Sequence, residues 1–161
     1  MINKLFSFLF LIAVVHAYSD QQTYRLRSGD YELSVSPRYC QTMRSISYDG
    51  RMLATPSGFY NLVIGEAAGK YVGAGHKEGG QEEVIGYRLV CDGQEINPEI
   101  GQTYSGEKIV LEKESRLLQT VFFSRIIMTP EGIVEQKRFR TLAAQSFYYF
   151  YVFLLFLNKF Y

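Results

Sequence analysis

The sequence predicts an all-β protein with the architecture of an antiparallel β-sandwich. Apolar and polar residues alternate in Tyr31 to Ser36, which is the period of a half-buried strand. Asp49-Gly50 and Asp92-Gly93 are dipeptides that favour hairpin turns. No long segment repeats apolar residues at the spacing of an amphipathic helix. Roughly eight to ten short strands separated by such turns are typical of a sandwich.

Further strands follow in order, and turn signals separate them. Val84 to Cys91 alternates, with Ile85, Tyr87 and Leu89 on one face. Thr129 to Gly132 predicts a tight turn, because its proline presets the bend and its glycine accepts a positive φ. We expect strands at 31–36, 46–48, 52–53, 61–64, 84–91, 108–111, 117–128 and 133–139.

The N-terminus predicts export. Met1 to Lys4 is short and positively charged, Leu5 to Val15 is almost wholly apolar, and Ala17 ends a small-residue cleavage motif. The apolar run is about half the ~20 residues of a membrane-spanning helix, which favours a cleaved signal over an uncleaved anchor. We expect a signal peptide at 1–17 and a single sandwich domain at 18–161. The protein is then secreted, or held in the periplasm or cell envelope.

The charge balance argues against nucleic acid as a partner. The chain has 17 Lys and Arg against 16 Asp and Glu, and Lys4 leaves with the signal. A protein that binds phosphates through charge needs a basic surplus, which this chain lacks. The sequence also shows no polybasic membrane patch.

Cys40 and Cys91 are the two cysteines of the chain. In an oxidising compartment they can form a disulfide, which would stabilise the fold by on the order of 4 kcal/mol. Each can instead be a small buried apolar residue. Sequence alone does not give the required geometry, so both interpretations stay open.

The C-terminal segment from Phe147 to Tyr161 is rich in Phe and Tyr. It can be a central strand buried on both faces. It can contact a membrane, although Leu142 to Leu157 is marginal in length for a span. We favour a third interpretation, in which the domain is incomplete at its C-terminus, because an exposed apolar edge strand promotes aggregation.

The glycine-rich stretch from Tyr71 to Glu83 holds the candidate site. Its glycines let the backbone bend and approach a ligand. A histidine beside carboxylates can do acid–base work, bind calcium or hydrogen-bond sugar hydroxyls, with a tyrosine ring for stacking. A solvated loop without a ligand is the fourth interpretation. The candidate ligand-binding residues are Tyr71, His76, Glu78, Gln81 and Glu82.

Other chemistries lack their motifs. Gly65 to Tyr71 has the wrong glycine spacing for a phosphate loop. The sequence contains no HExxH, no CxxC pair and no serine in a nucleophile-elbow context. We therefore assign no catalytic residue, no metal ligand and no cofactor, with calcium as the ion that the loop would suit.

Tyr31 to Gly58 (YELSVSPRYCQTMRSISYDGRMLATPSG) resembles the opening strands of galactose-mutarotase-like (aldose 1-epimerase-like) domains. Gly75 to Val84 is similar to secreted bacterial proteins with that sandwich, and Ile133 to Leu155 resembles its later strands. The resemblance spans roughly Tyr24 to Leu155 in the order of elements. It implies a mutarotase-like β-sandwich and a sugar-related role.

The chain differs from that family in its first turn and in the residues that carry the family's chemistry. Tyr39 to Thr42 replaces the usual glycine pair of the first turn, and nothing matches the epimerases' acid and base motifs. His76 is therefore not assigned as a general acid.

These observations favour a secreted module that contacts carbohydrate through the Tyr71 to Glu83 loop. One alternative is the N-terminal part of a sugar epimerase or a polysaccharide lyase or hydrolase, with its catalytic residues beyond Tyr161. Another is a structural cell-envelope protein whose aromatic segment contacts a membrane. The sequence names neither the sugar nor the oligomeric state.

Overall fold

The computed structural model describes residues 22–60, 62–68, 70–75, 82–152 and 154–157. The predicted signal peptide at 1–17 and the candidate residues His76, Glu78 and Gln81 lie outside these ranges. The described residues form strands in three sheets and one short 3-10 turn, η1 (Pro37–Tyr39), which confirms the predicted all-β sandwich. No helix among them is long and apolar enough to cross a membrane.

A six-stranded sheet has the order β14-β4-β3-β2-β1-β9. Its neighbours pair antiparallel except β1 and β9, which are parallel. Its strands are β1 (Tyr24–Ser28), β2 (Tyr31–Ser36), β3 (Thr42–Tyr48), β4 (Arg51–Tyr60), β9 (Thr103–Ser105) and β14 (Leu154–Leu157).

The other two sheets are wholly antiparallel. A five-stranded sheet has the order β12-β11-β10-β7-β8, and a three-stranded sheet has the order β13-β5-β6. Their strands are β5 (Leu62–Ala67), β6 (Lys70–Ala74), β7 (Glu83–Cys91), β8 (Gln94–Ile96), β10 (Ile109–Leu117), β11 (Thr120–Thr129), β12 (Gly132–Thr141) and β13 (Tyr149–Tyr151).

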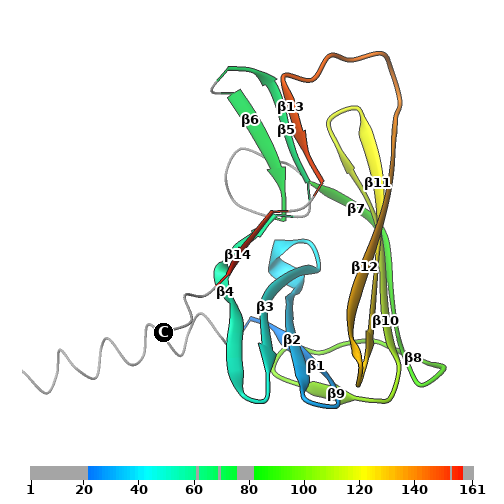
Figure 1. Cartoon of the computed structure of the whole chain (residues 1–161). Helices are drawn as coiled ribbons and strands as arrows, with labels where there is room; N and C mark the ends of the chain where they lie inside the picture. The colour runs from blue at the N-terminus through cyan, green and yellow to red at the C-terminus, as the bar shows by residue number, and fades with distance from the viewer. Residues whose placement is uncertain (1–21, 61, 69, 76–81, 153, 158–161) are drawn as a thin grey trace, which may run out of the picture.

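Two layers pack face to face (Figure 1). The five-stranded sheet forms one layer, and in the opposite layer the three-stranded sheet lies above the six-stranded sheet. Each of these two sheets packs on the five-stranded sheet through its own apolar cluster. The larger cluster joins β1, β2 and β3 to β7, β10 and β11 through residues that include Leu26, Leu33, Leu111 and Met128. The smaller joins the three-stranded sheet to Leu117 and Phe122.

The predicted hairpin turns are confirmed. Asp49 and Gly50 both have positive φ, at 48° and 71°, and so do Asp92 and Gly93, at 47° and 83°. Two consecutive positive φ values are those of a type I′ turn, whose twist matches that of the flanking strands. The Thr129 to Gly132 turn joins β11 to β12 as expected.

Some predicted strand bounds are wrong. The expected strands at 46–48 and 52–53 are parts of the longer strands β3 and β4. We expected strands at 108–111 and 117–128, but β10 runs on to Leu117 and β11 begins at Thr120. The turn falls at Leu118, which has a φ of 54°. The inward-facing residues of the second half of β10 include Lys113 and Ser115, so the apolar alternation that marks a strand is lost there.

The C-terminal strands lie at sheet edges. β13 is the edge of the three-stranded sheet and β14 is the edge of the six-stranded sheet. Tyr151 is exposed. Tyr149–Tyr151 therefore does not form a central strand that is buried on both faces.

The core makes a direct prediction. Leu33 is fully buried in the larger cluster, whereas Leu142 is exposed. We expect Leu33→Ala to lower the free energy of unfolding by about 2–5 kcal/mol, because it removes buried methyl groups and leaves a cavity. Leu142→Ala serves as the control and should change it little. Urea melts of both variants measure the difference, and equal effects would contradict the assignment of the core.

Candidate functional site

The described parts of the predicted loop lie in two different environments. Tyr71 lies on β6 and is exposed. Glu82 lies just before β7, and its side chain is 2% exposed because it turns inward to Lys113. The structure therefore does not place these two residues on one surface, and Glu82 belongs to the interior.

Tyr71 lies in a row that crosses the three-stranded sheet. Tyr149 of β13 pairs with Gly65 of β5, and Gly65 pairs with Tyr71 of β6. Paired residues share a face of a sheet, and the next positions along each strand face the other way. Phe150 and Ile64 are those next positions, and both pack in the smaller apolar cluster. The two tyrosines therefore lie on the outer face.

A glycine makes room for one of these rings. A Cβ atom built on Gly65 would lie 2.4 Å from the ring of Tyr149, so this ring lies directly across the glycine backbone. The Tyr149 ring also contacts the rings of Tyr151 and Tyr148, with centroid distances of 5.4 and 5.8 Å. We call Tyr71, Tyr148, Tyr149 and Tyr151 the tyrosine surface.

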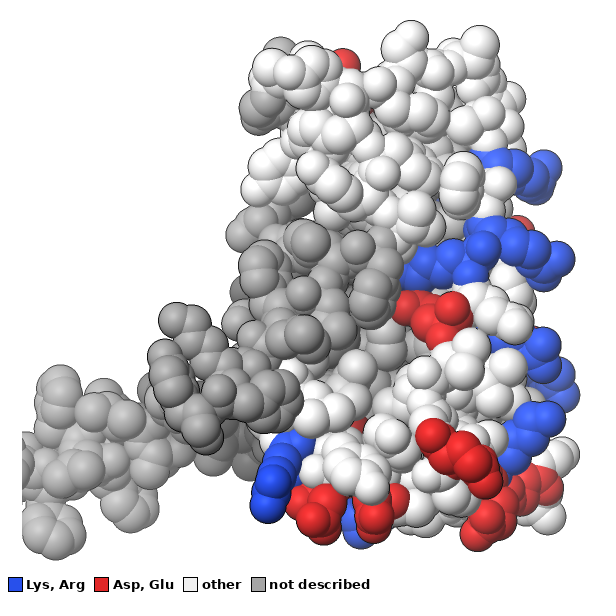
Figure 2. Space-filling view, viewed as in Figure 1, with Lys and Arg blue, Asp and Glu red and all other residues white. Residues whose placement is uncertain are grey.

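The tyrosine surface combines exposed aromatic rings with phenol hydroxyl groups. Tyr71, Tyr148 and Tyr151 are exposed, and Tyr149 is half-buried. Figure 2 shows few charged side chains over the upper half of the molecule, where the three-stranded sheet lies, and many over the lower half and along one edge. The rings of such a surface can pack against the apolar face of a ligand, while the phenol groups form hydrogen bonds with polar groups at the edge of that face.

A buried charged layer separates the two apolar clusters. Lys113 lies on β10 between Leu111 of the larger cluster and Leu117 of the smaller. Its Nζ donates to Oε1 of Glu82 at 2.7 Å and to the carbonyl oxygen of Cys40 at 2.6 Å. The Lys113 side chain is 3% exposed. This lysine therefore ties β10 to the connection after β2 and to the start of β7.

A second ion pair lies on β12, between two residues of that strand. Nζ of Lys137 is 3.3 Å from Oε1 of Glu135, and it donates to the carbonyl oxygen of Val152 at 2.8 Å. Ser124 donates its hydroxyl to the same Glu135 oxygen at 2.7 Å. Burial lowers the pKa of Lys137, and the Glu135 carboxylate opposes this effect. We call Glu82, Lys113, Glu135 and Lys137 the charged layer, which connects strands in the interior and presents little surface to solvent.

The cysteines are not joined in this structure. Both are free thiols. Cys40 donates to the carbonyl oxygen of Glu82 at 3.7 Å and Cys91 to that of Ser105 at 3.3 Å. Burial raises the pKa of both thiols, and the nearby carboxylates of Glu82 and Asp92 add to this effect. The disulfide that the sequence allowed is therefore absent between them here.

Metal binding has no centre in the part of the chain that the structure describes. No group of three or more His, Cys, Asp or Glu side chains comes together there. Two of the residues considered for calcium, His76 and Glu78, lie outside that part.

Comparison of this chain with protein-family models, with curated proteins and with solved structures finds no match.

Sequence reasoning found one member of the tyrosine surface, Tyr71, and missed the other three. The aromatic composition of the segment after Phe147 was the available signal. The pairing of β13 with β5 joins residues far apart in the chain, and this contact decides which tyrosines meet. Nothing local in the sequence marks Gly65 as the residue under the Tyr149 ring.

The charged layer predicts a strong asymmetry between single and double substitutions. Lys113→Met leaves the Glu82 carboxylate buried without its cation, so we expect the free energy of unfolding to fall by about 3–5 kcal/mol. Oε2 of Glu82 already has no hydrogen-bond partner among the described residues. We therefore expect Lys113→Met with Glu82→Leu to recover most of the loss. Urea melts test this, and a double variant as unstable as the single one would contradict it.

The free thiols lead to a prediction about how the two cysteines react with an alkylating reagent. Alkylation of the denatured, unreduced chain should add a label to each of the two cysteines. In the native protein at neutral pH the labelling should be slow, because a raised pKa keeps a thiol protonated and the thiolate is the nucleophile. Intact-mass spectrometry measures both. A chain that takes no label until it is reduced would show that Cys40 and Cys91 pair.

Proposed function

We propose that this protein is a secreted β-sandwich module that contacts carbohydrate through the tyrosine surface. The row of Tyr149, Gly65 and Tyr71 is the observation that carries the proposal. The export signal at 1–17 and the resemblance of 31–58 to mutarotase-like domains support it from the sequence.

The chemistry of a sugar suits this surface. A pyranose ring has faces of C–H groups and a rim of hydroxyls. Tyrosine has an apolar ring and one hydroxyl group that both donates and accepts. Tyr71 and Tyr149 lie on one sheet face, on either side of Gly65, and Tyr151 follows Tyr149 along β13. A neutral saccharide can therefore pack on the rings while its rim bonds to the phenol groups.

Sheet strands are a suitable scaffold for this contact. Tyr149 is held between the Gly65 backbone and the ring of Tyr151, so its ring position is set before a ligand arrives. Preorganised rings lose little conformational entropy on binding. The small core beneath, with Ile64 and Phe150, keeps β5 and β13 in register.

Removing the rings should weaken binding. We expect Tyr71→Ala and Tyr149→Ala each to weaken binding of a neutral oligosaccharide by about 2- to 10-fold, from the loss of one ring contact. Tyr48→Ala is the matched control, because Tyr48 is 42% exposed against 45% for Tyr71 but lies on β3. Calorimetric titration with oligosaccharides that the exported chain retains on a glycan array measures the effect.

Gly65→Ala adds a positional test. The new methyl group would collide with the Tyr149 ring, so we expect a loss similar to that of Tyr149→Ala although no ring is deleted. Folded variants that bind as tightly as the unsubstituted chain, or a control as weak as Tyr71→Ala, would remove the tyrosine surface from the proposal.

A further inference from the structure

Pairs of arginine and glutamate cross the outer face of the five-stranded sheet. Figure 2 shows basic side chains along the right-hand edge of the molecule, where this sheet lies in Figure 1. On β7, β10 and β11 each outward arginine forms an ion pair with a glutamate of a neighbouring strand. The pairs are Arg88 with Glu95 and Glu112, Arg116 with Glu83, and Arg125 with Glu112.

The two outward arginines of the edge strand β12 have no such partner. Arg138 pairs in register with Phe123 and Arg140 with Val121, so the neighbouring strand β11 offers them apolar side chains. Neither arginine forms an ion pair with a described residue. Arg138 stacks on the Phe123 ring, with its guanidinium carbon 4.8 Å from the ring centroid. Stacking uses the face of the planar guanidinium, so its N–H donors stay available for a carboxylate.

The positive charge of these two arginines is not balanced by the protein side chains around them. Arg138 and Arg140 line a depression of about 260 Å³ that has one carboxylate, Glu114. Glu114 lies on β10, two strand spacings or roughly 9–10 Å from β12. It forms no ion pair with a described residue. The surplus positive charge therefore lies at the edge of the sheet.

The edge strand β12 also has backbone groups that face away from its sheet. Among the described strands it pairs with β11 alone. The Leu142 amide donates to the Gln119 carbonyl oxygen across this pair at 2.7 Å. Backbone groups of an antiparallel strand alternate in direction, so those of the two arginines point to β11 and those of Phe139 and Thr141 point away from it. Neither Phe139 nor Thr141 makes a backbone hydrogen bond on that open side within the described chain.

The accessible part of this edge is short. Farther along β12, Glu135 and Lys137 face the interior and pair with each other, and their side chains are 12% and 9% exposed. Inward charges on an edge strand hinder the addition of another strand. Phe139 faces the same side, because it pairs with Phe122 of the smaller cluster, and it is 52% exposed. The segment 138–141 therefore combines two unpaired arginines, one accessible apolar position and free backbone groups.

We propose that the 138–141 edge binds an extended acidic peptide as an added antiparallel strand. Two carboxylates of the peptide, two residues apart, lie on Arg138 and Arg140, and an apolar side chain between them lies at Phe139. Residues two apart share a face of a strand, so both acids reach the arginines. The arginines are at non-hydrogen-bonded positions of the new pair, where side chains of two strands approach most closely. The added strand thus extends the pattern of cross-strand pairs to β12.

The proposal goes beyond the proposed function, because it names a peptide partner and uses a different sheet from the tyrosine surface. A second copy of this chain fits the edge less well. The outward side chains of β12 are Val134, Gln136, Arg138 and Arg140, so a second β12 would bring no carboxylate to the arginines. An acidic saccharide can contact the arginines but offers no backbone amides to the strand edge.

The first experiment compares two peptides that differ only in charge. The probes are acetyl-Thr-Glu-Val-Glu-Thr-amide and the same peptide with glutamine in place of both glutamates. We expect the protein to bind the acidic peptide about 3- to 10-fold more tightly, from two partly exposed charge pairs. Added salt should reduce the difference. NMR titration measures both dissociation constants. Equal affinities, or no binding of the acidic peptide at millimolar concentration, would overturn the proposal.

Methylation of the peptide backbone tests the strand pairing without altering the protein. In the proposed register the amide of the central valine donates to the Phe139 carbonyl oxygen, and the glutamate amides point away from β12. We expect a methyl group on the valine nitrogen to weaken binding about tenfold. A methyl group on the nitrogen of the second glutamate is the control and should change binding little. Equal effects of the two methyl groups would contradict the added strand.

Arginine variants separate this edge from general surface charge. Arg138→Gln and Arg140→Gln should each weaken binding of the acidic peptide by about 2- to 5-fold and leave the glutamine peptide unaffected. Arg116→Gln is the matched control and should leave binding unchanged. Arg116 is exposed and lies in the same cross-sheet row as Arg140, two strands from the edge. Equal losses in Arg116→Gln and Arg140→Gln would overturn the proposal.

The remaining outcomes identify a different occupant or separate the two proposals. A dimer that the acidic peptide dissociates in sedimentation would replace the peptide by a second copy of the chain. Trigalacturonate that binds more tightly than the peptide, and is lost in Arg138→Gln, would replace the peptide by an acidic saccharide. Tyr71→Ala should leave peptide binding unchanged, and Arg138→Gln should leave neutral-sugar binding unchanged. Failure at this edge therefore leaves the tyrosine surface standing, and the reverse also holds.

Discussion

Two ion pairs in the interior hold the middle of this sandwich, between its two apolar clusters. A buried charge costs several kcal/mol of desolvation unless a partner and hydrogen bonds compensate it. Lys113 finds both in Glu82 and in the Cys40 carbonyl oxygen, so it connects three separate segments of chain at one point. Lys137 and Glu135 do the same beside the C-terminal strand, through the Val152 carbonyl oxygen. Removing one partner of either pair would leave the other charge in the interior uncompensated, so these contacts favour this alignment of the two layers.

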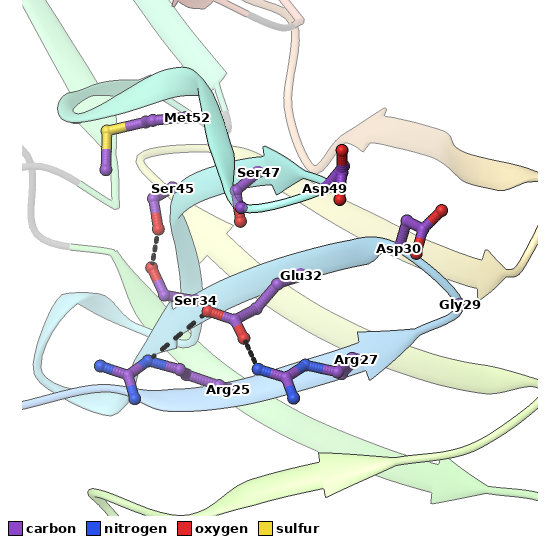
Figure 3. A pocket seen from close by; sticks show the side chains of 11 residues that line it. Arg25, Arg27, Gly29, Asp30, Glu32, Ser34, Ser45, Ser47, Asp49 and Met52 are labelled. Carbon is purple, nitrogen blue, oxygen red and sulfur yellow. Dashed lines mark hydrogen bonds and ion pairs between the residues drawn. The ribbon is translucent and has the colours of Figure 1, made fainter.

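The same layer divides the molecule into two parts with different surfaces. Above it, the three-stranded sheet packs on the smaller cluster and turns Tyr71 and Tyr149 outward. Below it, the six-stranded sheet packs on the larger cluster and turns Arg27, Glu32 and Ser47 outward (Figure 3). In both sheets, successive side chains of a strand point to opposite faces, so packing of the inner face also fixes the positions of the side chains on the outer face. The proposed sugar contacts therefore follow from the packing of the core beneath them.

Local sequence patterns predicted a large part of the fold. The Tyr31–Ser36 strand and the Asp49-Gly50 and Asp92-Gly93 turns were read correctly, because their signals lie within a few residues. The extent of β10 was not. Lys113 and Ser115 face inward there, so a polar interior interrupts the apolar period. At the candidate site, Tyr71 was predicted as a ring for stacking, whereas Glu82 was placed with it and lies in the interior.

Local sequence patterns were enough to predict the all-β class, the positions of the tight turns and the alternation that gives each strand an inner and an outer face. These are properties of neighbouring residues, set by backbone sterics and by the two-residue period of a strand. The pairing of the strands and the packing of the layers place Tyr149 across Gly65, Arg27 opposite Glu32 and Glu82 beside Lys113. The first and the last of these contacts join segments far apart in the chain, and all three depend on strand register. In the hairpin that holds Arg27 and Glu32 the turn fixes this register, whereas the two distant contacts depend on the burial of whole faces, which no local signal gives.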